Sequence, residues 1–400
     1  MRDYIGFRWS GQEWHIDEDG RAWFVDAQLD KLCCLNMQTG ECDFIAQLPN
    51  VGTDIFMLNT RCMKVGEEIF CMPCYGDKIW IYNISNTAFQ CVDLSNEKQD
   101  KLFMDFCWEY AGKLFCVSRT LGQIIAVDIH DKTVMYHAMN VSSEDTLLSC
   151  CVRVDTKIYC TSYKSNRIYQ FDMDSKETEI YVISDIDEGI ATMCFDGDKF
   201  WLCGYSKKIY VWDRDKNTVK AIENFPKQFG NYCFSQDMEQ LIDCESERYD
   251  TQLFCRLEAT EKYVWAIPYR TNLVLYIEKE TFEVHVLPIR DEEETKDSLS
   301  RSWQFKYFWQ YVRDGRYLGI FSLKNDYIYE IDTVELQETP QKFWLSDECL
   351  KLLWKNVIFE ESRKGHKLLF ERFLKMNKDE NGMSDRHQNS IGEKIFSCLK

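Results

Sequence analysis

The sequence contains few residues that break regular structure and no long apolar run. Six prolines in 400 residues argue against a disordered or linker-like chain. No apolar stretch approaches the roughly 18 residues that a membrane helix needs. Residues 1–10 show neither the apolar core nor the small-residue cleavage site of a secretory signal. We therefore expect a globular, cytoplasmic protein with no membrane partner.

Positive charge is in deficit as well. The chain has 48 Lys and Arg residues against 66 Asp and Glu residues, which gives a formal net charge of -18. The field of such a molecule repels the phosphate backbone of nucleic acids. Nucleic acid is therefore not an expected partner.

The sequence also lacks the common catalytic motifs. It has no Gly-x-Gly-x-x-Gly, Gly-x-Ser-x-Gly or phosphate-loop pattern. Acidic runs occur at residues 291–294 and around Asp185, Asp187 and Glu188, and such runs are typical of solvated loops. A glycosidase with two paired carboxylates stays open, because sequence does not give the distance between carboxylates.

Cysteine, in contrast, is abundant. Several of the 19 cysteines fall inside predicted strands, as at Cys71, Cys116 and Cys160, where a small buried apolar residue fits. Cys71 and Cys74 form the one Cys-x-x-Cys pair, and a structural zinc site needs four ligands. We expect structural free thiols, with no metal and no cofactor.

A repeat of 42 to 47 residues runs through the first half of the chain and continues with two longer intervals. Each unit has a polar turn, a strand centred on a large residue, a second turn and another apolar strand. The second strand starts 8 or 9 residues after the central residue, as a β-hairpin requires. The long intervals place insertions near residues 225–252 and 290–302. The seven central residues are Trp23, Phe70, Phe115, Tyr159, Trp201, Trp265 and Leu318.

Further apolar segments before and after each hairpin complete four antiparallel strands per unit. One such blade cannot bury both of its faces alone, so seven of them are expected to close into a ring. The predicted fold is an all-β, seven-bladed β-propeller over residues 13–345. Residues 1–12 form an N-terminal segment, and either residues 4–9 or residues 343–345 could supply the closing strand.

The tail has a different period. Apolar residues between 346 and 376 recur at spacings of three and four, which indicates helices. We therefore predict a short helical tail over residues 346–400, with a break near Gly365.

The unit from Ile16 to Phe24, with its continuation to Cys42 and Pro49, resembles the repeats of virginiamycin B lyase-like, NHL and kelch-related propellers. That resemblance implies ligand binding at the mouth of the central channel. The mouth is formed by the turns between second and third strands and by the connections between blades. It also implies, for the lyases, a cluster of histidine and glutamate with a divalent metal.

The turns at this mouth carry a column of tyrosines and at least one basic residue per unit. Rings of tyrosine stack on sugars, and guanidinium groups pair with oxyanions. The same residues also suit plain packing and solubility. The candidate ligand-binding residues are Tyr75, Tyr163, Tyr205, Tyr269, Arg119, Arg167 and Arg270. Further bases lie at Lys31, Lys78, Lys164, Lys207, Lys208 and Lys324.

The six histidines do not form the cluster that the lyase resemblance implies. His15 falls in a first-strand segment, His130 in an outer turn, His137 and His285 in outer strands, and His366 and His387 in the tail. We therefore expect a non-catalytic binding or scaffolding protein for a protein partner or a glycan-like ligand. The alternative is a propeller enzyme, either a metal-dependent lyase or a glycosidase.

Overall fold

The computed structural model describes most of the residues between Trp14 and Ser346. The described ranges are residues 14–26, 30–49, 59–94, 102–104, 106–145, 147–225, 253–268, 273–289, 307–322, 327–346 and 349. The predicted helical tail apart from Ser346 and Cys349, the segment 1–12 and most of both predicted insertions lie outside them. Among the described residues, none forms a helix with the length and apolarity that a bilayer crossing needs.

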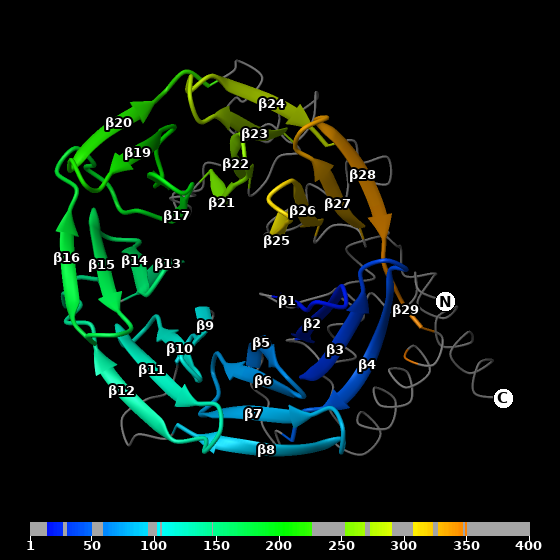
Figure 1. Ribbon diagram of the computed structural model, residues 1–400. Coiled ribbons are helices and arrows are strands. Elements are labelled where there is room, and N and C mark those ends of the chain that lie inside the picture. Colours follow the sequence, from blue (N-terminus) through cyan, green and yellow to red (C-terminus); the bar gives the residue numbers. More distant parts are fainter. Residues whose placement is uncertain are drawn as a thin grey trace, which may run out of the picture.

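The described elements are 29 β-strands arranged as seven sheets around a central axis, and neighbouring strands are antiparallel except for β29 (Figure 1). The predicted seven-bladed β-propeller is therefore confirmed. Blade 1 contains β1 (His15–Ile16), β2 (Arg21–Asp26), β3 (Lys31–Asn36) and β4 (Glu41–Gln47). Blade 2 contains β5 (Asn59–Val65), β6 (Glu68–Pro73), β7 (Lys78–Asn83) and β8 (Ala88–Asp93). Blade 3 contains β9 (Phe106–Tyr110), β10 (Lys113–Ser118), β11 (Gln123–Asp128) and β12 (Val134–Ala138).

The remaining four blades repeat this plan, with the strands of each sheet in chain order from the axis outward. Blade 4 contains β13 (Leu148–Val154), β14 (Lys157–Ser162), β15 (Arg167–Asp172) and β16 (Thr178–Val182). Blade 5 contains β17 (Thr192–Phe195), β18 (Phe200–Cys203), β19 (Ile209–Asp213) and β20 (Thr218–Ile222). Blade 6 contains β21 (Phe254–Ala259), β22 (Tyr263–Pro268), β23 (Leu273–Glu278) and β24 (Val284–Pro288). Blade 7 contains β25 (Tyr307–Arg313), β26 (Tyr317–Ser322), β27 (Tyr327–Asp332) and β28 (Gln337–Lys342).

The chain closes the ring with β29 (Trp344–Leu345), which pairs in parallel with the outer strand β4 of blade 1. Leu345 lies opposite Cys42, and the amide of Trp344 donates to the carbonyl of Gly40 at 2.8 Å. Of the two segments that could take this role, residues 343–345 therefore supply a closing strand, while residues 4–9 lie outside the described part.

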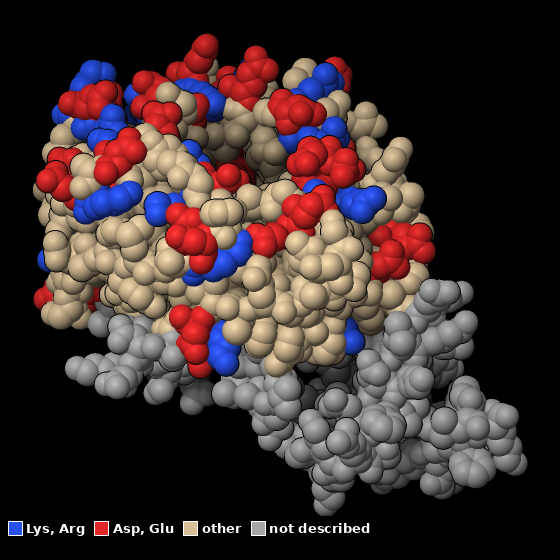
Figure 2. Space-filling view, turned by 60° about the horizontal axis from the view of Figure 1, so that its bottom comes forward, with Lys and Arg blue, Asp and Glu red and all other residues tan. Residues whose placement is uncertain are grey.

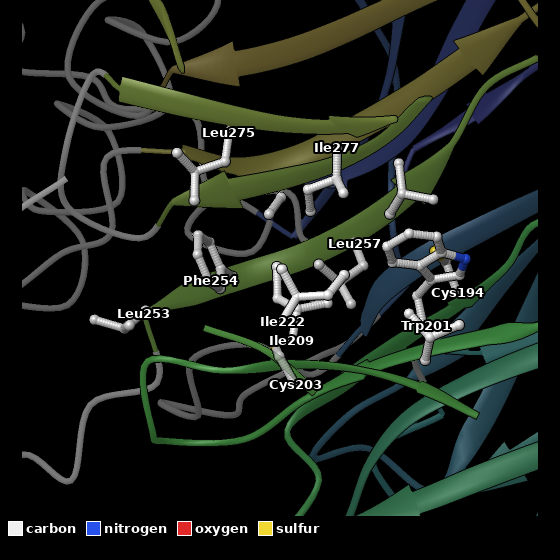
Figure 3. Close-up of a cluster of buried hydrophobic side chains, with 13 residues drawn as sticks. Cys194, Trp201, Cys203, Ile209, Ile222, Leu253, Phe254, Leu257, Leu275 and Ile277 are labelled. Carbon is white, nitrogen blue, oxygen red and sulfur yellow. The ribbon is translucent and has the colours of Figure 1, made fainter. Parts of the chain in front are cut away.

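The core consists of seven apolar clusters, one between each pair of neighbouring blades. Figure 3 shows the cluster between blades 5 and 6, where Trp201 and Cys203 of one sheet meet Leu257, Leu275 and Ile277 of the next. Burying an aliphatic or aromatic side chain in this way contributes about 1.5–3 kcal/mol. Packing between sheets thus holds the propeller together.

Six of the seven predicted central residues are buried against the following blade, with Trp23 beside Ile69 and Trp265 beside Ile320 as examples. Leu318 differs, because it packs back on blade 6 together with Trp265. In blade 7 the equivalent position is Gly319, which is paired with Tyr311. A Cβ atom on Gly319 would lie 2.0 Å from the Tyr311 ring, so this ring fills the space that a large residue fills in the other blades.

Candidate functional site at the channel mouth

The turns between second and third strands lie at the same end of the ring as the connections between blades, as the resemblance implies. Backbone hydrogen bonds join the two: the amide of Leu102 donates to the carbonyl of Cys74, and that of Ile183 to the carbonyl of Asn166. This end of the ring is called the channel mouth below. Tyr75, Arg119, Tyr163 and Tyr205 all follow second strands at this mouth.

Three of the predicted ligand-binding residues meet there, each from a different blade. The Arg119 guanidinium of blade 3 lies 5.9 Å from the ring centre of Tyr163 in blade 4. The Tyr205 hydroxyl of blade 5 donates to the Tyr163 carbonyl at 3.4 Å. The Arg119 Nε–H also donates to the Leu148 carbonyl at 2.7 Å, which fixes the guanidinium in place. Arg119, Tyr163 and Tyr205, all half-buried, are called the Tyr163 cluster.

Glu188, in the connection between blades 4 and 5, positions the blade 5 side of this cluster. Its Oε2 accepts the backbone N–H groups of Tyr205 at 2.7 Å and Ser206 at 2.8 Å. Its Oε1 accepts the hydroxyls of Ser206 and Tyr210. A carboxylate that accepts backbone N–H groups makes strong, charge-assisted hydrogen bonds. The Tyr205 backbone is therefore held by several bonds to a single side chain.

Two glycines allow the chain to approach Tyr163 closely. A Cβ atom on Gly189 would lie 1.9 Å from the Tyr163 carbonyl oxygen. A Cβ atom on Gly204 would lie 2.4 Å from the Gly189 carbonyl oxygen and 2.6 Å from the Glu188 carboxyl carbon. Both positions exclude any side chain, so they keep the two blades in close contact beneath the Tyr163 cluster.

Asp145 plays the corresponding part for blade 4. Its side chain is buried and accepts hydrogen bonds from Tyr169 at 2.6 Å, Ser162 at 2.7 Å and Ser165 at 2.9 Å. Burial alone would raise the pKa of Asp145, but these bonds and the one from Arg167 outweigh burial and lower it. Burial and the same bond raise the pKa of Tyr169 to about 12. Asp145 is thus an ionised anchor for the turn.

Arg167 and Tyr75, the other two predicted site residues within the described ranges, make contacts apart from the Tyr163 cluster. Arg167 pairs with Asp145 and Glu144, each at 3.3 Å. The Tyr75 ring packs edge-on against Phe103 at 4.9 Å. Tyr269 and Arg270 lie outside the described residues, as does Lys324.

Several of the predicted bases within the described ranges are paired or buried. Lys208 pairs with Glu223 at 3.0 Å, and Arg167 is paired as described above. Lys31 is buried and lies 5.5 Å from the ring centre of Phe44. Lys164 and Lys207 are exposed. On the face that Figure 2 turns toward the viewer, charges of both signs are mixed over the described surface. Of the described bases at the mouth, Arg119 is the one whose guanidinium lies over a tyrosine ring.

The channel is narrowed by residues at matching positions of the innermost strands. Arg256 of blade 6 reaches across to blades 3 and 4: its Nη1 lies 3.4 Å from Cys150 Sγ, and its guanidinium lies 4.9 Å from the Phe106 ring centre. These three residues have equivalent places in their innermost strands. Each comes two residues before the one that pairs with the central residue of its blade: Phe106, Cys150 and Arg256. Burial raises the pKa of the Cys150 thiol although Arg256 opposes this, so the thiol stays protonated.

Sequence reasoning missed Asp145, Glu188, Gly189 and Gly204. The two carboxylates could have been found from their similar spacing to the next strand. Asp145 comes seven residues before Val152, and Glu188 comes six residues before Cys194. Val152 and Cys194 pair with the central residues of their blades. The acidic stretch around Glu188 was expected to be a solvated loop. For Glu188 itself that expectation is wrong, because backbone N–H groups of the next blade bind its carboxylate.

The described histidines and cysteines give no metal centre. His15 lies in β1, His130 in the turn before β12, His137 in β12 and His285 in β24, so they belong to blades 1, 3 and 6. Within the described ranges, no three His, Cys, Asp or Glu side chains come together in a way that could hold a metal ion. All 16 described cysteines are free, and 15 of them are buried.

The sequence matches no family model and none of the curated proteins. Solved structures show the same fold at low identity. Virginiamycin B lyase from Staphylococcus aureus has 12% identity and a TM-score of 0.57, over 78% of this chain and 92% of that one. A streptogramin B lyase has 11% identity and a TM-score of 0.56, over 79% and 91%. The computationally designed Ika8 protein has 9% identity and a TM-score of 0.54, over 85% and 89%. The chain is thus a seven-bladed β-propeller similar in fold to the virginiamycin B lyases.

Proposed function

We propose that this propeller is a non-catalytic binding or scaffolding protein whose ligand docks at the channel mouth on the Tyr163 cluster. The observation that carries the proposal is the meeting of Arg119, Tyr163 and Tyr205 from three successive blades. A half-buried tyrosine beside an arginine offers a ring for stacking and a guanidinium for oxyanions. The ligand class that this chemistry fits best is a glycan-like molecule, with a polar protein surface as the second class.

The architecture supports binding because the cluster is held before any ligand arrives. Glu188 fixes the backbone of Tyr205, and the Leu148 carbonyl holds Arg119. Groups that are already in place lose little conformational entropy when a ligand binds. The free thiols support a reducing compartment, and we infer a cytoplasmic location.

The alternative is an enzyme, as the fold similarity to lyases suggests. A metal-dependent lyase needs several metal ligands that converge on one point. The described histidines instead belong to blades 1, 3 and 6. A glycosidase needs two carboxylates that are free to react. Asp145 and Glu188, the carboxylates nearest the cluster, are engaged in bonds to the propeller itself.

The test compares Tyr163→Ala and Tyr205→Ala with the wild type for binding to an immobilised panel of neutral and uronate-containing oligosaccharides. Tyr136→Ala is the matched control, because Tyr136 is 40% exposed on the outer strand β12 and is not part of the Tyr163 cluster. We expect at least one oligosaccharide to bind Tyr163→Ala and Tyr205→Ala at least ~10-fold more weakly than the wild type, a difference of about 1.4 kcal/mol. Its affinity for Tyr136→Ala should equal that for the wild type.

Two results would contradict the proposal. Equal binding by the wild type and both mouth variants would remove the Tyr163 cluster as the site. Breakdown of a bound oligosaccharide, seen as new reducing ends or unsaturated products, would replace the binding role with the enzymatic alternative. Tyr269→Ala extends the series to blade 6.

A further inference from the structure

Two neighbouring outer strands expose large apolar side chains toward the gap between their blades. Met135 of β12 is 39% exposed, and Ile180 and Val182 of β16 are 45% and 52% exposed. Met135 is paired with Ala126, and Ile180 with Tyr169, and both partners belong to the cluster between blades 3 and 4. The three exposed side chains therefore border the same gap. They are called the blade 3–4 strip.

The corresponding place in blade 1 is covered by the chain itself. Phe44 of β4 occupies the position that Ile180 has in β16. Each is paired with the third residue of the third strand of its blade, which is Cys33 in β3 and Tyr169 in β15. Phe343 and Leu345, next to and within β29, are 1% and 5% exposed. They lie in the cluster between blades 7 and 1, against which Phe44 packs.

Figure 1 shows this difference in the ribbon, with β29 lying outside β4, and β16 as the outermost strand of its own sheet. An extended segment with apolar side chains at alternate positions thus already completes one outer edge of this propeller. Among the described strands, no fifth strand covers the edge of β16.

The edge of β16 also lacks the usual protection of an outer strand. Exposed edges normally carry proline or charge, which prevents pairing with other chains. Three other outer strands follow this rule, with Lys220 in β20, Pro288 in β24 and Pro340 in β28, while β12 of the neighbouring blade has neither proline nor an acidic or basic residue other than His137. The sequence of β16, Thr-Glu-Ile-Tyr-Val, has one charge, Glu179, which is on the face opposite Ile180 and Val182.

Two polar atoms beside the strip add a second observation. His137 Nε2 of β12 and Thr178 Oγ1 of β16 are buried and have no hydrogen-bond partner among the described residues. Both belong to the strand faces that border the gap, since His137 is paired with Ile124 and Thr178 with Phe171 of the same cluster. Buried polar atoms are nearly always hydrogen-bonded in native proteins.

We propose that the edge of β16 binds an extended segment of a partner protein as a fifth strand of blade 4. The segment would run parallel to β16, as β29 runs parallel to β4, and its apolar side chains at positions i and i+2 would cover Ile180 and Val182 and reach Met135. Strand addition of this kind takes affinity from backbone hydrogen bonds and specificity from alternate side chains. This surface lies on the outside of the ring and does not depend on ligand binding at the channel mouth.

The probe is a fluorescent peptide with the sequence of residues 341–347, Gln-Lys-Phe-Trp-Leu-Ser-Asp, because this segment contains β29. Binding is measured by fluorescence anisotropy with the full chain and with Ile180→Asp and Val182→Asp. Ala221→Asp is the matched control, since Ala221 is the exposed residue of β20 that is paired with Tyr210 as Ile180 is with Tyr169. A peptide with serine in place of Phe and Leu tests the i and i+2 requirement.

We expect saturable binding that weakens at least ~10-fold in Ile180→Asp and Val182→Asp, stays unchanged in Ala221→Asp, and is absent with the serine peptide. The amides of β16 should then gain protection from hydrogen exchange. Because both substituted side chains are exposed, unchanged thermal unfolding will show that the variants fold.

Three results would overturn the proposal. The first is equal peptide binding by the wild type and Ile180→Asp. The second is protection confined to β4, which would mean that the peptide displaces β29. The third is a concentration-dependent dimer that Ile180→Asp abolishes, since a second copy would then be the occupant. Tyr163→Ala should bind the peptide normally, which separates this proposal from the one for the mouth.

Discussion

Trp23 donates its indole N–H to Oδ2 of Asp17 over 2.8 Å, from the central strand position of blade 1 to the turn that precedes it. The same arrangement recurs in blade 5, where Trp201 donates to Asp196 at 2.6 Å. In blade 6 the acceptor is the Thr260 hydroxyl, at 3.0 Å from Trp265. A buried indole N–H left without an acceptor is costly, so each tryptophan at the central position is matched by an oxygen in its own turn.

Asp17→Ala should lower the free energy of unfolding by about 1–3 kcal/mol, because it leaves the Trp23 N–H unpaired and removes the 3.0 Å ion pair with Lys64 of blade 2. Chemical denaturation followed by tryptophan fluorescence measures this loss. Asp19→Ala, an exposed neighbour in the same turn, should change stability little. A similar loss in both variants would contradict the role assigned to Asp17.

The stabilising effect of Asp17 should also depend on pH. Burial would raise the pKa of Asp17, but hydrogen bonds from Trp23, Arg21 and Lys64 outweigh burial and lower it. The ionised carboxylate therefore stabilises the fold above the ordinary pKa near ~4, and this contribution disappears as the pH falls through the lower value of the folded state. The difference between wild type and Asp17→Ala should shrink in acid.

Tyr169 should remain protonated to unusually high pH. Burial and the hydrogen bond to Asp145 raise its pKa to about 12, above the ordinary value of ~10. Because the folded state holds this proton more tightly, its contribution to stability is complete below pH ~10 and is lost as the pH rises through about 12. The phenolate absorbance of the wild type minus that of Tyr169→Phe reports the titration. Asp145→Asn should move it to lower pH.

Leu345→Ala tests the closure of the ring. Leu345 is 5% exposed and belongs to the cluster between blades 7 and 1, so truncation should cost about 2–5 kcal/mol. Thermal unfolding measures the loss, with Val334→Ala as control because Val334 is 58% exposed. Hydrogen exchange should increase first in β4 and β27. Unchanged stability would mean that β29 contributes little to closure.

Cys91 should be the first of the described cysteines to react with an alkylating reagent. It is exposed on β8, whereas the other 15 described cysteines are buried. Burial raises the pKa of Cys34 and Cys255 to about 12, and a protonated thiol is a poor nucleophile. Peptide mapping by mass spectrometry after brief iodoacetamide treatment gives the order. Early labelling of Cys71 or Cys160 would contradict the structural role predicted for them.

The fold could be read from the sequence because hairpin register is a local property. The separation between Tyr159 and the start of the next strand follows from one turn and two paired strands, so it repeats from blade to blade. Register also explains why the prediction of Leu318 as the central residue of blade 7 is wrong, since Gly319 has that position. A shift of one residue moves a side chain to the other face of a sheet, and the glycine that takes the central place in blade 7 has no side chain that marks it.

The site was less predictable, because it depends on contacts between blades. A shared column identified Tyr163 and Tyr205, but nothing in that column shows that Arg119 of another blade lies over Tyr163 or that Asp145 binds Arg167. Gly189 and Gly204 are informative only once the distances to neighbouring carbonyl oxygens are known. Interactions across sheets depend on the position of each blade relative to the next.

The parallel pairing of β29 with β4 joins residues separated by about 300 positions in the chain. The residues of blade 7 and β29 that pack against Phe24 and Cys42 of blade 1 are therefore synthesised after all the other blades. Proteins that expose apolar surface in this way while they are being made are prone to aggregate. A chaperone that binds the nascent chain would find its natural target on blade 1.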